Sequence, residues 1–106
     1  MRELDYEDLD ELLHARIRLA IVSYLIGAGE SDFTSIRDAI GATDGNLSVH
    51  ARKLEEAGYI EIRKLFVDNK PATRYALTDT GRRAFKSYVE SLGRFIARGG
   101  TAADRT

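Results

Sequence analysis

The sequence predicts a mainly α-helical domain that carries one β-hairpin. Apolar residues recur at helical spacing in four segments, within residues 9–26, 33–40, 47–54 and 85–96. Between the third and fourth segments the apolar period changes to two, on both sides of a turn sequence, which is typical of a hairpin. The chain has 106 residues, enough for one compact domain and too few for two.

The first helical segment should bury the side that carries its apolar stripe. That stripe contains Leu9, Leu12, Leu13, Ile17, Ala20, Ile21, Tyr24 and Leu25, and it is widened by Leu19, Val22 and Ile26. Gly27 and Gly29 are expected to end the segment, because glycine supplies the positive φ that helix ends favour. Periodicity leaves open whether residues 1–27 form one helix or two that meet near His14.

Two further helices are expected close together. Asp32 is a good N-cap for a short helix that Gly41 ends, with Phe33, Ile36, Ala39 and Ile40 inward. Thr43 can cap the next helix, in which Asp44 suits the positive end of the dipole and Gly58 follows the last turn. Its inward residues are Leu47, Ala51 and Leu54. The short connection between these helices indicates a helix-turn-helix.

The hairpin is expected at about residues 59–78, followed by one more helix. Ile60 and Ile62 alternate with Glu61 and Arg63, Asp68-Asn-Lys-Pro71 is a turn sequence, and Thr73, Tyr75 and Leu77 alternate on the return. Thr78 and Asp79 begin the last helix, whose apolar stripe is Phe85, Tyr88, Val89, Leu92, Phe95 and Ile96. Residues 1–98 are thus predicted to form a single domain, and residues 99–106 a flexible tail that has nothing to bury.

This order of elements is the winged helix-turn-helix plan with extra N- and C-terminal helices. Over residues 14–95 the chain resembles the small winged-helix transcriptional regulators related to MarR-like and ArsR-like repressors. The resemblance rests on Arg18-Leu-Ala-Ile21, Asp32-Phe-Thr-Ser-Ile-Arg37, Thr43-Asp-Gly-Asn-Leu-Ser48, Lys53-Leu-Glu-Glu-Ala-Gly-Tyr59 and Leu77-Thr-Asp-Thr-Gly-Arg-Arg-Ala-Phe85. It implies a homodimeric DNA-binding repressor or activator, with the third helix in the major groove and the hairpin wing beside the DNA backbone.

The distribution of charge is compatible with duplex DNA as a partner, although the net charge is −1. Residues 1–13 hold six acidic side chains and one arginine, whereas residues 37–98 hold twelve basic and eight acidic side chains, a net charge of +4. A basic body with an acidic end would let one face meet phosphates while another faces away. A solvated acidic helix with no electrostatic role would give the same pattern.

Other functional classes find little support in the residues. The sequence has no nucleophile-and-base constellation and no phosphate-binding glycine loop, so we expect no enzyme activity and no cofactor. His14 and His50 lack partners at zinc-ligand spacing, so no metal site is predicted. Because the chain has no cysteine, no apolar run of membrane-spanning length and no signal-peptide pattern, we expect a cytoplasmic protein that does not bind membranes.

The candidate DNA-binding residues are small or polar near the start of the third helix and basic further along. Asn46 could read adenine, Val49 could contact a thymine methyl group, and Arg52 and Lys53 could neutralise phosphates. Each has a structural alternative: completion of the helix start for Asn46, packing against the wing for Val49, and pairing with Glu55 or Glu56 for the two cations. The full predicted set is Thr34, Ser35, Gly45, Asn46, Ser48, Val49, Arg52, Lys53, Lys70 and Arg74.

A homodimer is expected because two helices related by a two-fold axis can address two half-sites about one helical turn apart. The predicted interface combines the terminal helices and consists of Leu4, Leu9, Leu12, Leu13, Phe85, Tyr88, Leu92 and Phe95. An intramolecular cap over the core would use the same apolar residues. A small-molecule effector could bind between the terminal helices and the core, although no residue set specifies one. A winged helix that binds another protein instead of DNA is the alternative function.

Overall fold

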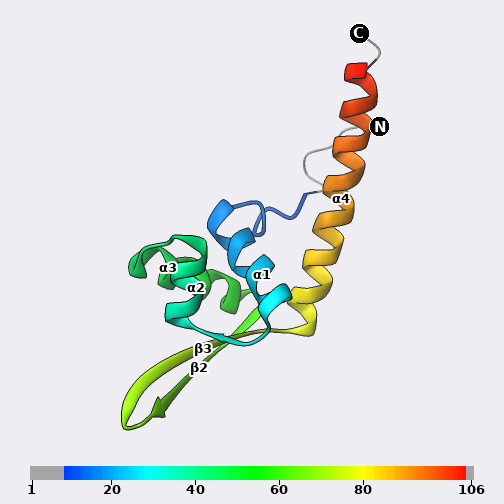
Figure 1. The fold of residues 1–106 in the computed structure, drawn as a ribbon. Helices are drawn as coiled ribbons and strands as arrows, with labels where there is room; N and C mark the ends of the chain where they lie inside the picture. The colour runs from blue at the N-terminus through cyan, green and yellow to red at the C-terminus, as the bar shows by residue number, and fades with distance from the viewer. Residues whose placement is uncertain (1–8, 105–106) are drawn as a thin grey trace.

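The computed structural model describes residues 9–104, and the side chains of residues 9–97. In this range the elements follow in the order α1 (Arg16–Ala28), β1 (Ser31–Asp32), α2 (Phe33–Ile40), α3 (Asp44–Glu56), β2 (Ile60–Val67), β3 (Lys70–Leu77) and α4 (Asp79–Asp104) (Figure 1). The mainly α-helical winged-helix fold that the sequence predicted is therefore confirmed. The sequence signals at the helix ends also hold: Asp32 caps α2, Thr43 caps α3, and Gly41 adopts a left-handed conformation after α2.

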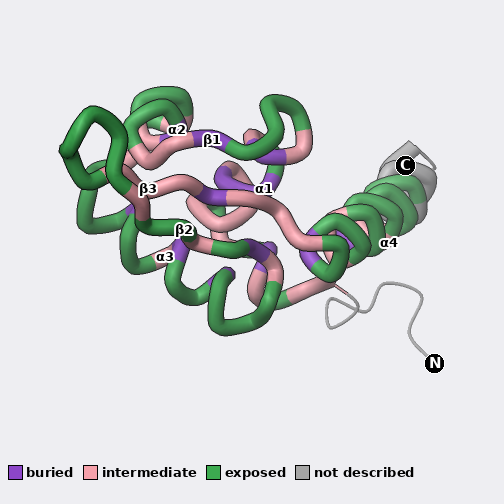
Figure 2. Tube along the Cα trace, turned by 90° about the horizontal axis from the view of Figure 1, so that it is seen from below, coloured by how far each residue is buried: buried purple, intermediate pink, exposed green. Residues whose placement is uncertain are grey.

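One hydrophobic core joins the helices to the base of the sheet, as the buried segments in Figure 2 show. The core residues of α1 and α3 are those that the helical periodicity predicted to face inward. The buried apolar side chains are Leu13, Ile21, Val22, Leu25, Ile36, Leu47, Ala51, Leu54, Ile60, Tyr75 and Tyr88. Because α3 buries only one side, its other side remains available to a partner.

The sheet has three antiparallel strands in the order β1-β3-β2. The long hairpin pairs residues from Ile60↔Leu77 to Val67↔Lys70, as the alternating pattern indicated. The sequence did not predict β1, which pairs Ser31 with Tyr75 and Asp32 with Arg74. A strand of two residues is too short to show any period, so only its partner strand defines it.

The hairpin turn is tighter than the predicted four residues. Asp68 and Asn69 form it alone, with positive φ values of 52° and 62°, the conformation of a two-residue turn that suits twisted strands. Lys70 and Pro71 already belong to β3, and Pro71 is opposite Phe66. Since β1 covers β3 only at Arg74 and Tyr75, Pro71 lies where β3 has no second neighbour, a position that tolerates proline.

The segment before α1 corrects the predicted helix over residues 9–26. Residues 9–15 form a turn, in which the backbone amides of Leu12 and Leu13 donate to Asp10 Oδ1 at 2.9 and 3.2 Å, and the regular helix begins only at Arg16. The turn lets Leu13 enter the core while satisfying its own backbone amides. At the other end Gly27 lies inside α1, and Gly29, with φ 78°, is the glycine that ends it.

Helix α4 is longer than the sequence predicted. It continues through Gly99, where the tail was expected to begin, and ends at Asp104. A glycine inside a helix costs only about 1 kcal/mol relative to alanine, so a helix that is already formed can pass through it. Figure 1 shows that the hairpin and the C-terminal part of α4 project from the core in opposite directions. The two surfaces can therefore serve different partners.

Candidate nucleic-acid interface

Helix α3 is held so that one side points away from the molecule. Leu47, Ala51 and Leu54, spaced i, i+4 and i+7, are buried completely and set the orientation of the helix. The Thr43 hydroxyl accepts a hydrogen bond from the backbone amide of Asn46 at 3.1 Å, which fixes the N-terminal turn. The outward side of α3 is thus defined by three core contacts and one cap.

The outward side chains of α3 are small near the N-terminus and basic further on. Gly45, Val49 and Arg52 lie opposite the buried stripe, and Val49 is 56% exposed, so it does not pack against the wing. Only the backbone of Asn46 takes part in the cap, which leaves its exposed side chain available. All six predicted residues of this helix are exposed: Gly45, Asn46, Ser48, Val49, Arg52 and Lys53.

The two cations of α3 are not paired with neighbouring acids. Among the residues whose side chains the structure describes, no carboxylate lies within ion-pair distance of Arg52 or Lys53, although Glu55 and Glu56 follow them directly. The intrahelical pairing that the sequence left open is therefore not formed. Both cations can meet an external anion without first breaking an internal ion pair.

An open groove of about 590 Å³ runs between α3 and the sheet. Ser48, Arg52 and Glu55 line it from α3, and Ile62, Lys64, Thr73 and Tyr75 line it from the hairpin, with Phe33 beside them. Burial, followed by the nearby Glu55 carboxylate, raises the pKa of Tyr75, so this phenol stays neutral. The positive charges at the groove are those of Arg52 and Lys64, whose side chains are exposed.

The first turn of α2 contributes two exposed hydroxyl residues, Thr34 and Ser35. The backbone amide of Ser35 donates to Asp32 Oδ1 at 2.7 Å. This bond and a side-chain hydrogen bond from Ser35 lower the pKa of Asp32, so Ser35 takes part in the cap. Among the described contacts, the side chain of Thr34 takes no part in this cap.

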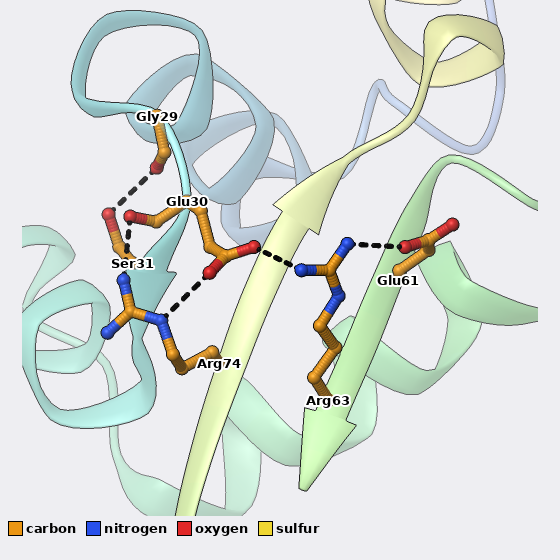
Figure 3. Close-up of polar contacts among 6 residues, drawn as sticks. All are labelled: Gly29, Glu30, Ser31, Glu61, Arg63 and Arg74. Carbon is orange, nitrogen blue, oxygen red and sulfur yellow. Dashed lines mark hydrogen bonds and ion pairs between the residues drawn. The ribbon is translucent and has the colours of Figure 1, made fainter. Parts of the chain in front are cut away.

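The predicted wing residues Lys70 and Arg74 differ in environment. Lys70 is exposed beside the turn, and no carboxylate of the described part of the chain pairs with it. Arg74 Nε donates to Glu30 Oε2 at 3.0 Å, and Glu30 Oε1 accepts from Arg63 Nη1 at 2.9 Å (Figure 3). Arg63 also donates to Glu61 Oε2 at 3.1 Å. These contacts favour a different role for Arg74: it fastens the hairpin to the segment before β1.

Helix α3 is also connected to the N-terminal turn. Arg18 Nη1 lies 3.1 Å from His50 Nδ1, and Arg18 Nε donates to the Leu12 carbonyl at 2.6 Å. Burial, then the positive charges of Arg18 and Lys53, lower the pKa of His50. His50 therefore accepts the hydrogen bond as a neutral imidazole and belongs to the support of the helix rather than to its outer surface.

Several residues predicted for a dimer interface are buried within a single chain. Leu13 is completely buried, and Tyr88 is 4% exposed with its hydroxyl 2.9 Å from His14 Nδ1. For these two residues the intramolecular alternative accounts for the burial. Leu9, Leu12, Phe85 and Leu92 are partly buried against the core, Phe95 is partly buried without joining it, and Leu4 lies outside the described residues.

The N-terminal turn and α4 flank a second open cavity of about 480 Å³. The Tyr59 hydroxyl donates to Asp10 Oδ2 at 2.7 Å beside it, and burial together with this bond raises the pKa of Tyr59 to about 12. The cavity occupies the place at which the sequence allowed an effector. Its lining, which includes Asp10, Glu11, Ser87 and Tyr88, is acidic and phenolic.

The residues predicted from the sequence include neither Glu30, Lys64 nor Phe66. Glu30 is separated from Arg63 and Arg74 by 33 and 44 residues, so no local pattern could reveal the pairs. Lys64 and Phe66 continue the alternation of Ile60 and Ile62, which was a usable signal for the face on which they lie.

In the part of the chain that the structure describes, no helix is long and apolar enough to cross a membrane.

Comparisons with known proteins agree with this geometry. The family model for the winged helix DNA-binding domain matches residues 17–96. An uncharacterized protein of Methanocaldococcus jannaschii is 33% identical over 82 residues, which cover 77% of this chain and 89% of that protein. The structure of a transcriptional regulator homologue from Pyrococcus horikoshii OT3 is similar with a TM-score of 0.73 and 31% identity, over 86% of this chain and 95% of that one.

A more distant structure shares the fold. The zinc-responsive MarR family member ZitR from Lactococcus lactis is similar with a TM-score of 0.59 and 14% identity, over 85% of this chain and 61% of that one. This likeness shows a shared fold. The resemblance to winged-helix transcriptional regulators is supported by the family model and the Pyrococcus horikoshii structure, whereas the MarR-like and ArsR-like parts stay predictions. Regulators of this fold are not enzymes, in agreement with the sequence. The chain belongs to the winged helix DNA-binding domain family, a family of transcriptional regulators.

Proposed function

We propose that the protein is a sequence-specific regulator that binds double-stranded DNA as a homodimer, with α3 in the major groove and the hairpin beside the backbone. The observation that carries this proposal is the outward side of α3, which is exposed along its length while the opposite side is fully buried. A helix can enter the major groove only when such a side is unobstructed.

The order of side chains along α3 suits that role. Gly45 and Ser48 near the N-terminus are small enough for close approach, and Asn46 can form two hydrogen bonds with adenine. Arg52 and Lys53, further along, are the residues that would neutralise phosphates. Thr34 at the start of α2 and Lys70 on the wing would add contacts with the DNA backbone.

The homodimer would form through α4. Val89 and Ile96 on this helix are 49% and 62% exposed, and their spacing of seven residues puts them on one side of it. Apolar side chains at i and i+7 define a stripe that a second copy of the helix could cover. Because this part of α4 projects away from the hairpin (Figure 1), dimerisation would leave α3 and the wing accessible.

Binding to DNA over a salt series tests this function. We expect fluorescence anisotropy with a mixed-sequence duplex of about 30 base pairs to show strong binding at low salt. With Arg52, Lys53 and Lys70 of each subunit on phosphates, the logarithm of the association constant should fall against the logarithm of salt with a slope of roughly −5. Selection from a random pool should then yield an inverted repeat with half-sites about one helical turn apart.

The alternative is a winged helix that binds a protein, which the net charge of −1 favours. Absence of duplex binding at any salt concentration would support this alternative and contradict the proposal. Binding with the expected slope but without a selected sequence would limit the function to non-specific association with DNA.

A further inference from the structure

The tip of the hairpin exposes a large aromatic side chain that the core does not use. Phe66 is 74% exposed, the highest value among the exposed large apolar residues, and it lies two residues before the turn. Apolar side chains of this size, at the tip of a structure that reaches toward DNA, are of the kind that minor-groove binding proteins insert between base steps. The neighbouring Val67 is 51% exposed and serves below for comparison.

The strand register places Phe66 on the side of the hairpin that faces α3. Residues directly opposite each other in an antiparallel pair share a face, and successive residues alternate. The pairs Ile62↔Tyr75 and Lys64↔Thr73 line the groove beside Ser48 and Arg52. Continuing along the same face, the next pair is Phe66↔Pro71, so both apolar side chains extend the wall of this groove toward the tip. Val67 and Lys70 form the next pair and lie on the opposite face.

The charges around Phe66 indicate the chemistry of its partner. Lys64 precedes it by two residues on the same face, about 7 Å away along the strand. No acidic residue belongs to this face from Lys64 to the turn or to the paired stretch of β3, whereas Glu30 and Glu61 occupy the other side with Arg63 and Arg74. The carboxylates of Asp68, in the turn, and Glu55, on the α3 wall of the groove, lie outside this stretch of the face. An exposed ring two residues from a lysine suits a polyanion that also offers an apolar surface, and the sugars and base edges of DNA offer one.

We propose that Phe66, supported by Pro71, is a wedge that enters the minor groove next to the major-groove site of α3 and partly unstacks a base step there. The minor groove of B-DNA is about 6 Å wide and 7.5 Å deep, so an aromatic ring can contact its walls and floor. Lys64 binds the phosphate that flanks this groove. This inference rests on the proposed function, since it adds a second contact to the same duplex.

The wedge has a consequence for sequence choice at positions that α3 does not touch. Pyrimidine–purine steps such as TA and CA unstack with the least cost, so the flank of each half-site should favour them. The wedge should also bend the duplex toward the major groove.

The test compares three single variants on the duplex selected by the wild-type protein. Phe66→Ala should bind about a hundredfold more weakly, roughly tenfold for the aromatic contact of each subunit, with an unchanged salt slope. Val67→Ala, a change of an exposed apolar side chain one residue away on the other face, should bind like the wild type. Lys64 adds one phosphate contact per subunit to the six counted above, so the wild-type slope should be roughly −7, and Lys64→Ala should return it to roughly −5.

Energy transfer between dyes at the two ends of the duplex reports the bend. The wild type and Val67→Ala should increase transfer, and Phe66→Ala should not. Replacing a flanking TA step by GC should weaken the wild type but leave Phe66→Ala unaffected. Circular dichroism should give equal melting temperatures for Phe66→Ala and Val67→Ala, because both side chains are more than half exposed.

Two results would overturn the wedge and leave the proposed function intact. The first is equal affinities and equal bends for Phe66→Ala and Val67→Ala. The second is a change in the sedimentation of Phe66→Ala in the absence of DNA, which would assign Phe66 to a contact between protein chains. Failure of the wild type to bind any duplex would instead remove the proposed function, and the wedge with it.

Discussion

Arg52 is a residue whose contribution to DNA binding should not depend on sequence. Its guanidinium lies on the outward side of α3, and no described carboxylate neutralises it. We expect Arg52→Ala to weaken binding to selected and random duplexes alike and to reduce the magnitude of the salt slope by about 1 per subunit. Anisotropy titrations at several salt concentrations measure both quantities. A loss confined to the selected duplex would show that Arg52 reads bases.

Asn46 should behave in the opposite way. Its backbone amide completes the Thr43 cap, but its side chain is exposed and carries the donor and acceptor that adenine recognition needs. Asn46→Ala should therefore cost about 1–3 kcal/mol of binding free energy per half-site on the selected duplex and almost nothing on a random one. Equal losses on both duplexes would remove the base-reading role. The melting temperature is the control, since alanine keeps the capped backbone amide.

His50 should make the stability of the protein sensitive to pH. Burial and the charges of Arg18 and Lys53 lower its pKa in the folded protein below the usual 6.5. The stability that comes from the neutral imidazole is fully present above pH 6.5, and it is lost as pH falls from there through the lower folded pKa.

The variant His50→Gln isolates this effect, because glutamine can accept the Arg18 hydrogen bond but does not titrate in this range. We expect the free energy of unfolding to fall more for the wild type than for His50→Gln between pH 7 and pH 5. Urea titrations over this range supply the measurement. Parallel curves for the two proteins would mean that other groups cause the pH dependence.

At the scale of single elements, the start of α4 depends on a glycine that belongs to a motif of the family resemblance but for which the sequence predicted no role. Gly81 is buried in the first turn, and a Cβ atom there would overlap the backbone carbonyl of Tyr59. The same carbonyl accepts from the Thr78 amide at 3.0 Å, so it cannot move without breaking the connection between β2 and α4.

Gly81→Ala should therefore destabilise the protein by about 1–3 kcal/mol, even though alanine favours helices. Gly93→Ala is the matched control, since nothing in the described structure lies within 4 Å of a Cβ atom at Gly93. This second change should stabilise the protein by about 0.5–1 kcal/mol. Thermal unfolding measures both. A stabilising effect at Gly81 would contradict the contact with Tyr59.

The elements also explain why the hairpin keeps a defined position over the core. Glu30 accepts from Arg74 and Arg63, and the Arg74 guanidinium also donates to the Glu30 carbonyl at 3.2 Å. Exposed ion pairs of this kind contribute only about 0–1 kcal/mol to stability, so their effect is mainly on orientation. These ion pairs occupy the face of the hairpin that lies opposite α3, and Lys64 and Phe66 lie on the face toward the groove.

At the scale of the whole molecule, the separation of α4 from the wing predicts a functional homodimer. Ile96 on α4 is 62% exposed and lies on the apolar side of the helix. Ile96→Glu would place a charge in the interface, so we expect a shift toward monomer in sedimentation velocity and a large loss of affinity for the two-half-site duplex.

Arg94→Glu is the control for this change. Arg94 lies on the opposite side of α4, is exposed, and donates to Ser91 within its own helix. A larger change of charge at this position should leave the oligomeric state unaltered. Equal effects of the two substitutions would indicate that charge, rather than an apolar contact, explains the result, and a monomeric wild type would remove the homodimer proposal.

Local patterns in the sequence were sufficient for most of the architecture. Asp32 and Thr43 were predicted as caps because a side-chain acceptor just before an apolar period satisfies the free amides of the first turn, and both accept such bonds. The inward residues of α3 and the alternation along β2 and β3 were likewise predictable, since each depends only on neighbours within a few residues.

Contacts between distant residues were decided by the tertiary structure alone. The two-residue strand β1, the Glu30 pairs with Arg63 and Arg74, and the burial of Leu13 and Tyr88 all join segments far apart in the chain. The sequence by itself determined which residues form helices and strands and which side of each is apolar, because these follow from backbone geometry over a few residues. Which apolar and charged groups meet, and which stay exposed as Phe66 and Ile96 do, depends on how the elements pack, and no local period contains that information.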